Sequence, residues 1–447
     1  MKLSRYFQQV ELKNNIYAIF NSLVMDVLYV NKKKLDEILS KKVTEEEQEK
    51  LLNIGIYVTD NKQDHDALQL VKNRYNAVSG KVYIMYLVLT SACNLACKYC
   101  FIENCTFNNK VEINMNLDTV KTAILKYSEY LKKENIDEGT LIFYGGEPLV
   151  NWEAITTAIE LAKELKAPIK FSMVTNATLL SDEKIKYLAE NDVEIGISID
   201  GPKQLNDKNR IYRGNNRSVY DEIIEKFPKL KINKCKFGLS ITISQDFLEM
   251  QDEVLEWLKK LNVTSIFYNL YHYTCYENGW EEYYQEASKF LLKSYETLTS
   301  NEIYDGRLIR KVESFFNSEF KFSDCGAIGG NQLAIKPNGD VCICHGYLKT
   351  DKYVIGNINK NSIYEIMDSD EINFWKNRCT LNCEECLNCE AIYMCGGGCA
   401  IQAEALFGDR SCLDKPFCIH TKTALKWILQ NCYDRLNNEV EKEVIEC

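Results

Sequence analysis

Three cysteines near residue 95 form the group with the clearest chemistry in this sequence of 447 residues. Cys93, Cys97 and Cys100 are spaced Cys-x3-Cys-x2-Cys. Thiolates prefer soft metals, and three of them can hold three irons of a four-iron cluster while the fourth iron stays open to an outside ligand. A zinc knuckle and incidental buried thiols are the alternative interpretations. The spacing therefore predicts a metal centre with one exchangeable position.

A second group of cysteines lies between residues 325 and 418. The chain has 19 cysteines but only four histidines, and the histidines do not fall at zinc-ligand spacing with one another. Clustered cysteines in a long chain without a signal peptide indicate metal binding rather than disulfides. Because the ligands would be sulfur alone, iron–sulfur clusters are favoured over zinc.

The elements that must position the first cysteines follow an alternating pattern. Residues 82–89 form an apolar run with the length of a buried strand, so the cysteines lie on the loop that leaves it. Further strands are expected at 141–144, 169–176, 193–200, 237–243 and 265–269, separated by helical patterns. This alternation predicts an α/β fold with about six βα units in an open partial barrel. In such folds, active sites lie at the carboxyl ends of the strands.

The strand at 141–144 runs into a Gly-Gly-Glu-Pro turn. Glycines allow the backbone to approach a ligand closely, and proline fixes the turn. The carboxylate in the turn can accept a hydrogen bond from an ammonium group. Its residues are Gly145, Gly146, Glu147 and Pro148.

The loop motif, with Tyr99 just before its third cysteine, resembles that of the radical S-adenosylmethionine superfamily. The resemblance implies that S-adenosylmethionine binds the open iron of a four-iron cluster. The reduced cluster would cleave the cofactor to a 5′-deoxyadenosyl radical, which removes hydrogen from a substrate. It also implies that an electron donor such as flavodoxin or ferredoxin reduces the cluster. The turn at residues 145–148 would contact the amino group of the cofactor.

Further cofactor contacts are implied by the same resemblance. Asn176 lies in a Thr-Asn-Ala-Thr segment that is similar to the Thr-Asn-Gly-Thr of the family, with Ala177 as the departure. Ser198 and Asp200 stand where relatives contact the ribose. Arg210, with Arg213 as a second candidate, could pair with the carboxylate of the cofactor, and a plain surface role is the alternative.

The later cysteines resemble the seven-cysteine SPASM extension, with the pattern Cys-x13-Gly-x4-Cys, then Cys-x2-Cys-x5-Cys-x3-Cys, then Cys. The resemblance implies two auxiliary four-iron clusters, and so three clusters in all. The first auxiliary cluster would use Cys325, Cys344 and Cys399. The second would use Cys386, Cys389, Cys395 and Cys418, with Cys412 as the alternative to Cys418.

The first auxiliary set lacks a fourth cysteine. Some relatives have one shortly before the position of Cys325, but residues 315–324 contain none. Either Cys342 or Cys275 completes the cluster, or one iron is open and could bind a substrate thiolate. A bound thiolate is deprotonated and positioned, which suits the formation of a thioether.

The N-terminal segment predicts a small unit with three strands at residues 6–12, 16–20 and 25–30, followed by helices. It resembles the winged-helix domains that recognise a leader peptide in enzymes that modify ribosomally made peptides. In those domains the leader adds as an edge strand beside the third strand. A structural cap on the barrel is the alternative.

These features predict five regions. They are a winged-helix-like leader domain (1–80), the radical S-adenosylmethionine partial barrel (81–270), a bridging region (271–322), the SPASM domain (323–420), and a C-terminal helix with a solvated acidic tail (421–447). The net charge of −10 without a basic run argues against nucleic acid, and no apolar segment could span a membrane. We therefore expect a cytoplasmic protein.

The function expected from these resemblances is thioether crosslinking of a precursor peptide, as in enzymes of the sactipeptide and ranthipeptide type. A carbon–carbon crosslink or an epimerisation would use the same parts. An anaerobic sulfatase-maturing enzyme is a further alternative. An iron–sulfur electron carrier is the non-enzymatic one, although it would not need an open iron beside a cofactor turn.

Overall fold

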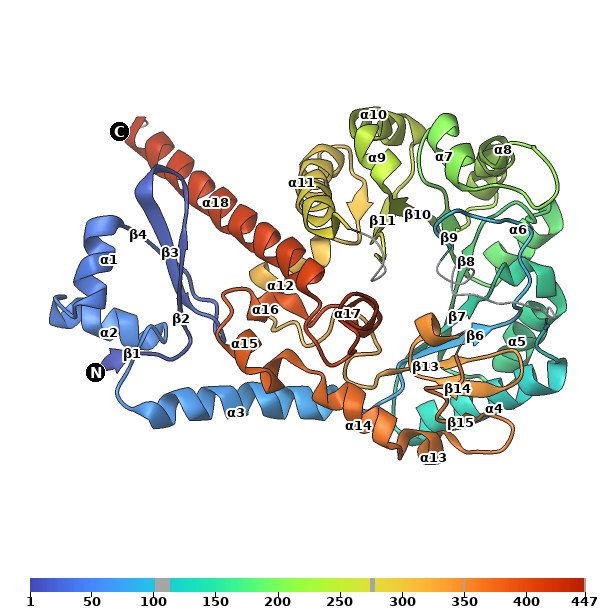
Figure 1. Ribbon diagram of the computed structural model, residues 1–447, viewed down its shortest axis with the longest axis horizontal. Coiled ribbons are helices and arrows are strands. Elements are labelled where there is room, and N and C mark those ends of the chain that lie inside the picture. Colours follow the sequence, from blue (N-terminus) through green and yellow to red (C-terminus); the bar gives the residue numbers. More distant parts are fainter. Residues whose placement is uncertain (101–112, 274–277, 349, 446–447) are drawn as a thin grey trace.

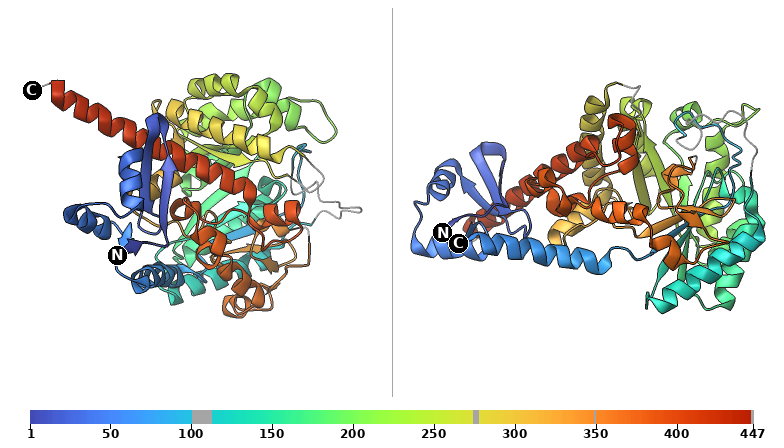
Figure 2. Two further views of the ribbon diagram at one scale, coloured as in Figure 1. Left: turned by 60° about the vertical axis from the view of Figure 1, so that its left-hand side comes forward. Right: turned by 60° about the horizontal axis from the view of Figure 1, so that its bottom comes forward.

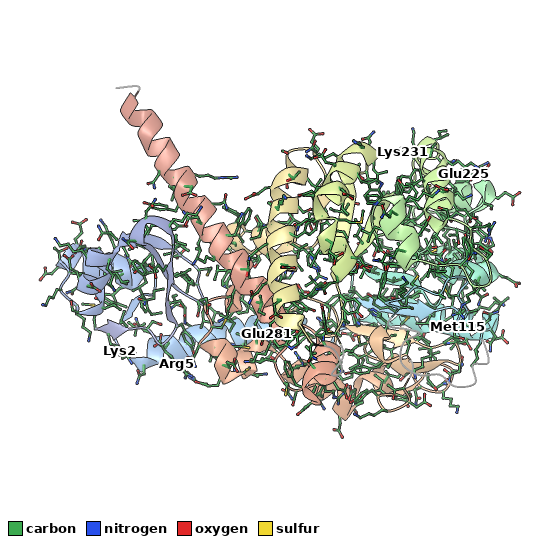
Figure 3. All side chains as sticks on the ribbon, turned by 45° about the horizontal axis from the view of Figure 1, so that its top comes forward. Lys2, Arg5, Met115, Glu225, Lys231 and Glu281 are labelled. Carbon is green, nitrogen blue, oxygen red and sulfur yellow. The ribbon has the colours of Figure 1, made fainter. Side chains whose placement is uncertain are left out.

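The computed structural model describes residues 1–100, 113–273, 278–348 and 350–445. Cys105 and Cys275 lie outside these ranges. A small N-terminal unit stands at one end of the long axis and a strand-and-helix barrel at the other (Figure 1). Lys2 in the N-terminal unit and Glu225 in the barrel mark these two ends (Figure 3).

Six parallel strands form the centre of the barrel. They follow one another in chain order across the sheet, which confirms the expected series of βα units. The strands are β6 (Ile84–Val88), β7 (Gly139–Tyr144), β8 (Ile169–Thr175), β9 (Glu194–Ser198), β10 (Phe237–Ile243) and β11 (Ser265–Leu270).

Helices cover the outer face of this sheet. In β7 the buried Leu141 and Phe143 alternate with half-buried Ile142 and Tyr144, so one side of the strand packs in the main core and the other faces the barrel interior. Side-chain caps such as Asn116 on α4 fix where helices begin. The helices are α4 (Leu117–Lys133), α5 (Trp152–Glu164), α6 (Asp182–Glu190), α7 (Lys203–Asn209), α8 (Val219–Ile232), α9 (Gln245–Glu249), α10 (Gln251–Leu261) and α11 (Trp280–Thr299).

The sheet continues beyond the six strands at both edges. The short β12 (Tyr304–Asp305) adds beside β11, and β13 (Gln332–Ile335) pairs in parallel with β6. The strands β14 (Asp340–Cys342) and β15 (Gly356–Asn357) follow in antiparallel order. The sheet therefore has ten strands among the described residues. The hairpin of β13 and β14 was expected, but its union with the barrel depends on pairing between segments far apart in sequence.

The N-terminal unit contains the predicted three-stranded antiparallel sheet of β2 (Phe7–Glu11), β3 (Ile16–Asn21) and β4 (Leu28–Asn31). The third strand begins later than expected, because Met25 has a left-handed φ of 69° that interrupts an extended chain. A short pair, β1 (Lys2–Leu3) with β5 (Tyr57–Val58), was not expected as a pair. The helices of the unit are α1 (Lys32–Leu39), α2 (Glu45–Asn53) and α3 (Asn61–Val78).

Both faces of this small sheet are covered. Ile19 and Val30 pack in one cluster with Leu35 and Ile38 of α1. On the other face, strand residues such as Phe20 share a second cluster with Leu425, Ile428 and Leu429 of the C-terminal helix. The sheet order leaves β4 as an edge strand.

The C-terminal helix α18 (Lys415–Ile445) is 31 residues long. A short helix followed by a solvated acidic tail was expected, and this was wrong in extent because the acidic residues up to Ile445 continue the helix. Together with α3, α18 runs between the barrel and the N-terminal unit (Figure 2). None of the described helices is long and apolar enough to cross a membrane.

Short helices make up most of the cysteine-rich region between β12 and α18. They are α12 (Ile309–Phe316), η3 (His345–Tyr347), α13 (Ile363–Met367), α14 (Asp370–Asn377), η4 (Thr380–Asn382), α15 (Glu384–Leu387), α16 (Ile392–Cys395) and α17 (Ala400–Phe407).

Candidate functional site

The Gly-Gly-Glu-Pro turn packs against the start of the cysteine loop. The amide of Gly146 donates to the carbonyl oxygen of Thr90 at 2.9 Å, and that of Glu147 donates to Ala92 at 2.8 Å. A Cβ on Gly146 would lie 2.2 Å from the oxygen of Ala92, and one on Gly145 would lie 2.6 Å from that of Thr90. The glycines were expected to admit a ligand, but the close neighbour in the structure is the cysteine loop itself.

The other side of the loop is held by the chain that follows α7. The amide of Ala96 donates to the carbonyl oxygen of Ile211 at 2.7 Å, and that of Lys98 donates to Asn209 at 3.0 Å. The Nε of Arg213 donates to the carbonyl oxygen of Leu95 at 3.2 Å. The loop is therefore fixed on both sides by main-chain contacts.

The three thiols of the loop come together. Burial raises the pKa of Cys93 to about 12, and nearby charges on Glu147, Cys97 and Cys100 act in the same direction. Burial likewise raises the pKa of Cys97 to about 11, against the charge of Arg210. Free thiols with these pKa values are neutral near pH 7, so binding of a metal would release their protons. We call these residues the loop cysteines.

This donor set fits an iron–sulfur cluster better than a single ion. No group of three or more histidine, cysteine, aspartate or glutamate side chains in the described part of the chain is placed to bind one metal ion. In a four-iron cluster each cysteine binds a different iron, so the thiols need not converge on one point.

Glu147 is a buried carboxylate between the ends of β7 and β8. It is 1% exposed and accepts from the hydroxyl of Thr175 at 2.6 Å, the amide of Asn176 at 2.8 Å and the amide of Leu149 at 3.1 Å. Burial raises its pKa, whereas these hydrogen bonds lower it. The contacts hold the carboxylate in place near Cys93, where it could accept from a cationic group. Pro148 opens the short helix η2 (Pro148–Asn151), which this carboxylate caps.

Asn176 connects β8 to the cysteine loop. Its amide nitrogen donates to the side-chain oxygen of Asn94 at 2.9 Å, and Asn94 donates to the hydroxyl of Thr178 at 2.8 Å. Asn94 was not predicted, and its position directly after Cys93 was the only available signal. Ala177 has a φ of 59°, the left-handed conformation that glycine adopts most easily. The departure from the family pattern therefore leaves the turn in place.

Asp200 lies at the centre of a buried polar group. It is 0% exposed and forms a bidentate ion pair with Arg210, whose Nε and Nη2 lie 3.0 and 2.9 Å from its oxygens. The hydroxyl of Tyr99 and the amide of Thr242 also donate to it. Ser198 lies nearby, at the end of β9 opposite Ser240 of β10. The contacts of Asp200 and Arg210 with the cofactor stay predictions. In the structure these two side chains bind each other, so the cofactor would bind groups that are already paired.

The later cysteines gather in two sets. In the first, the three-cysteine set, the thiol of Cys344 lies close enough to Cys399 and Cys325 that their charges add to the rise in its pKa caused by burial. The thiol of Cys344 accepts from the amide of Gly346 at the start of η3, and Cys399 directly precedes α17. The amide of Cys399 donates to a carboxylate oxygen of Asp414 at 2.8 Å.

The second, the four-cysteine set, comprises Cys386, Cys389, Cys395 and Cys418. Burial raises the pKa of Cys418 to about 12, and charges on Cys395 and Cys389 would raise it further. The thiol of Cys386 is close to that of Cys383 first, and also to those of Cys395 and Cys418, so Cys383 is a fifth thiol beside this set. The structure therefore brings Cys418 to this set, and the carbonyl oxygen of Cys412 binds Arg378 instead.

Cys342 is the candidate fourth member of the three-cysteine set within the described residues. It is 0% exposed and close to Cys344. Its thiol donates to the carbonyl oxygens of Ala334 at 3.6 Å and Cys344 at 3.4 Å, so it is engaged with the main chain of its own hairpin. Cys275, the other candidate, lies outside the described residues.

A group of rings that the sequence did not reveal lies between the loop cysteines and the three-cysteine set. His345 stacks on Tyr86 with ring centres 4.4 Å apart, and Tyr144 is 5.0 Å away. Burial raises the pKa of Tyr144, and charges on Cys100 and Cys344 would raise it further. Tyr144 therefore lies within electrostatic range of both sites.

Two family models match the chain. The model of the radical SAM superfamily matches residues 87–258, and the SPASM model, an iron–sulfur cluster-binding domain, matches residues 325–390. The first range begins in β6 and covers the cysteine loop.

Known proteins resemble the chain over much of its length. The radical SAM cyclopropyl synthase TigE of Paramaledivibacter caminithermalis is 24% identical over 452 residues, which cover 94% of this chain and 90% of that protein. The cysteine-type anaerobic sulfatase-maturating enzyme of Clostridium perfringens is 27% identical over 329 residues, covering 69% and 86%.

Solved structures share the fold. Native anSMEcpe with bound AdoMet superposes with a TM-score of 0.67 at 21% identity, covering 79% of this chain and all of that one. Streptococcus suis SuiB bound to S-adenosylmethionine superposes with a TM-score of 0.56 at 15% identity, covering 94% and 100%. The chain is therefore a radical SAM protein that carries a SPASM iron–sulfur cluster-binding domain.

Proposed function

We propose that the protein modifies a ribosomally made precursor peptide by forming a thioether between a cysteine sulfur and a carbon atom. The loop cysteines would hold a four-iron cluster, and the turn at residues 145–148 with Asn176, Ser198, Asp200, Arg210 and Tyr99 would form the surroundings of S-adenosylmethionine. When bound, the cluster and cofactor supply one-electron cleavage of the cofactor and removal of a hydrogen atom from the substrate. The three-cysteine and four-cysteine sets would hold two auxiliary clusters.

The role of the chain in this chemistry is positioning. The paired main-chain contacts on both sides of the cysteine loop keep the loop cysteines in one arrangement. Glu147 offers a fixed, buried acceptor for the ammonium group of the cofactor, and Asn176 and Asn94 join that acceptor to the loop. Such fixed groups lower the cost of orienting reactants.

A peptide substrate is supported by relatives that match nearly the whole chain. One of them is SuiB, which has a structure bound to its precursor peptide SuiA and covers 93% of this chain at a TM-score of 0.55. Native anSMEcpe covers 79% of this chain at a TM-score of 0.67. The match to SuiB extends over more of the chain, which favours a precursor peptide as the substrate.

The N-terminal unit provides a place for a leader peptide. Helices cover both faces of its sheet, and β4 stands at the edge. A leader could add as a fourth strand beside β4, with main-chain hydrogen bonds that depend little on its sequence. We accordingly propose residues 1–80 as the leader domain, 81–270 as the barrel, 271–322 as a bridge and 323–420 as the SPASM domain.

The thioether is supported by the unequal sizes of the two cysteine sets, and this observation carries the proposal. Five thiols lie together at the second set, because Cys383 contacts Cys386, and four of them would saturate a cluster. Three gather at the first, and Cys342 beside them donates to main-chain carbonyls. An iron without a protein ligand would be free to bind and deprotonate a substrate thiol.

A carbon–carbon bond is the second candidate. TigE, which matches 94% of this chain, is named a cyclopropyl synthase, and closing a cyclopropane ring joins two carbon atoms. The two candidates differ in what happens to the thiols of the substrate, so one experiment separates them.

The experiment is anaerobic co-expression with a short cysteine-rich peptide encoded beside the gene, followed by intact mass measurement before and after alkylation. Loss of two hydrogens for each thiol that resists alkylation would support a thioether. Loss of two hydrogens with every thiol alkylated would establish a carbon–carbon bond and refute the thioether. An unchanged peptide, with enzyme that still cleaves S-adenosylmethionine, would contradict the proposal and favour sulfatase maturation as the function.

Two cysteine variants serve as a matched pair in this experiment. Cys97→Ala removes a loop cysteine and should abolish cofactor cleavage. Cys235→Ala removes a half-buried cysteine whose thiol contacts the carbonyl oxygen of Ile185, outside all three sets, and should leave cleavage unchanged. Cleavage by Cys97→Ala would contradict the proposed cluster site.

A further inference from the structure

Lys311 of α12 is a buried lysine that the proposed reaction does not use; burial lowers the pKa of its amino group, and the negative charge of Asp324 raises it. Its residue is 1% exposed. Its Nζ donates to the hydroxyl of Thr421 at 3.2 Å and to the carbonyl oxygen of Met394 at 3.4 Å, and it lies 4.5 Å from the ring centre of Phe417. Both hydrogen-bond acceptors are neutral. A buried cation held mainly by neutral groups is costly unless an anion lies close by.

The partners of Lys311 surround one member of the four-cysteine set. Met394 directly precedes Cys395, and the hydroxyl of Thr421, which accepts from Lys311, also lowers the pKa of the Cys395 thiol. Burial raises the pKa of that thiol, whereas the positive charge of Lys311 lowers it. Lys311 therefore lies close to Cys395, because its contacts with Met394 and Thr421 are both beside that thiol.

The nearby carboxylate balances Lys311 only in part. Lys311, Arg307, Arg310 and Lys321 all act on Asp324 and, against the effect of burial, hold its pKa at about 2. Asp324 forms an ion pair with Arg307 at 3.2 Å. One carboxylate shared among these cations leaves positive charge beside Cys395.

We propose that Lys311 is a positioning residue that directs positive charge toward the iron–sulfur cluster of the four-cysteine set, and so keeps that cluster easier to reduce. The inference rests on the ligand set given under the proposed function. A cluster bound by four thiolates is anionic, and reduction makes it more so. A nearby cation stabilises the reduced form more than the oxidised form.

The test is a redox titration followed by electron paramagnetic resonance. It uses full-length protein in which Cys93, Cys97 and Cys100 are all changed to Ala, so that only the auxiliary clusters contribute. Lys311→Met should lower the ratio of reduced to oxidised cluster at a fixed potential about tenfold, which is a shift of 59 mV for one electron.

Lys426→Met is the matched control, because it removes the same charge from an exposed position on α18 where water screens it. Its midpoint should equal that of the parent. Thr421→Val keeps the shape of the side chain but removes the hydroxyl between Lys311 and Cys395, and it should lower the midpoint without altering the fold.

The outcomes distinguish a failure of the role of Lys311 from a failure of the proposed ligand set. Full iron content in the parent with an unchanged midpoint in both Lys311→Met and Thr421→Val would overturn the role of Lys311. Iron and sulfide too low for a cluster at the four-cysteine set in the parent would overturn the ligand set, and with it this inference. A lowered midpoint in Lys311→Met but not in Lys426→Met would support it.

Discussion

Replacing Gly146 by alanine should displace the cysteine loop. The added Cβ would lie 2.2 Å from the carbonyl oxygen of Ala92 and 2.6 Å from its carbonyl carbon. The first distance is about 1.2 Å short of ordinary contact at 3.4 Å. Because the neighbour is main chain and cannot rotate away, the turn and the loop must separate. Overpacking of this kind costs about 1–3 kcal/mol, and the two main-chain hydrogen bonds that join turn and loop add about 1 kcal/mol each. We expect a loss of about 3–5 kcal/mol.

The assay is chemical unfolding together with the iron content after anaerobic reconstitution. Gly196→Ala in β9 is the matched control, because its Cβ would meet its nearest neighbour at 3.6 Å, which is ordinary contact. Gly146→Ala should lower both the unfolding midpoint and the iron bound, and Gly196→Ala should lower neither. Wild-type stability and iron content in Gly146→Ala would refute the view that the glycines serve loop packing.

Two further predictions concern buried charges. Asp200→Asn leaves the guanidinium of Arg210 buried without its counter-charge and should cost about 3–5 kcal/mol in urea unfolding, whereas Asp221→Asn, in an exposed ion pair, should change the midpoint little. Equal midpoints for the two variants would contradict this. Burial raises the pKa of Asp305 from its ordinary 3.8 to about 6, so its ionised form destabilises the fold, and that cost grows as the pH rises from about 4 to 6. Asp305→Asn should therefore gain up to about 3 kcal/mol over the wild type above pH 6 and nothing below pH 4; a gain that does not vary with pH would count against this assignment.

Much of the site was predictable because it depends on local spacing. The loop cysteines and the turn at residues 145–148 are short motifs at the ends of strands, and parallel strands in chain order bring such ends together. The grouping of the later cysteines was expected from the resemblance to the SPASM extension, and their roles as ligands stay a prediction. The six strands β6 to β11 appear where apolar runs indicated them.

The tertiary structure decided what depends on contacts between distant segments. Spacing could not show that Gly146 faces Ala92, that Arg210 binds Asp200, or that β13 extends the barrel sheet beside β6, since each requires the chain to be folded. Burial is likewise a property of the packed molecule. Lys311 looks like an ordinary polar residue in the sequence, and it becomes unusual only because folding buries it beside Cys395. The sequence alone therefore determined which residues could bind metal, and folding decided the charges and hydrogen bonds that surround them.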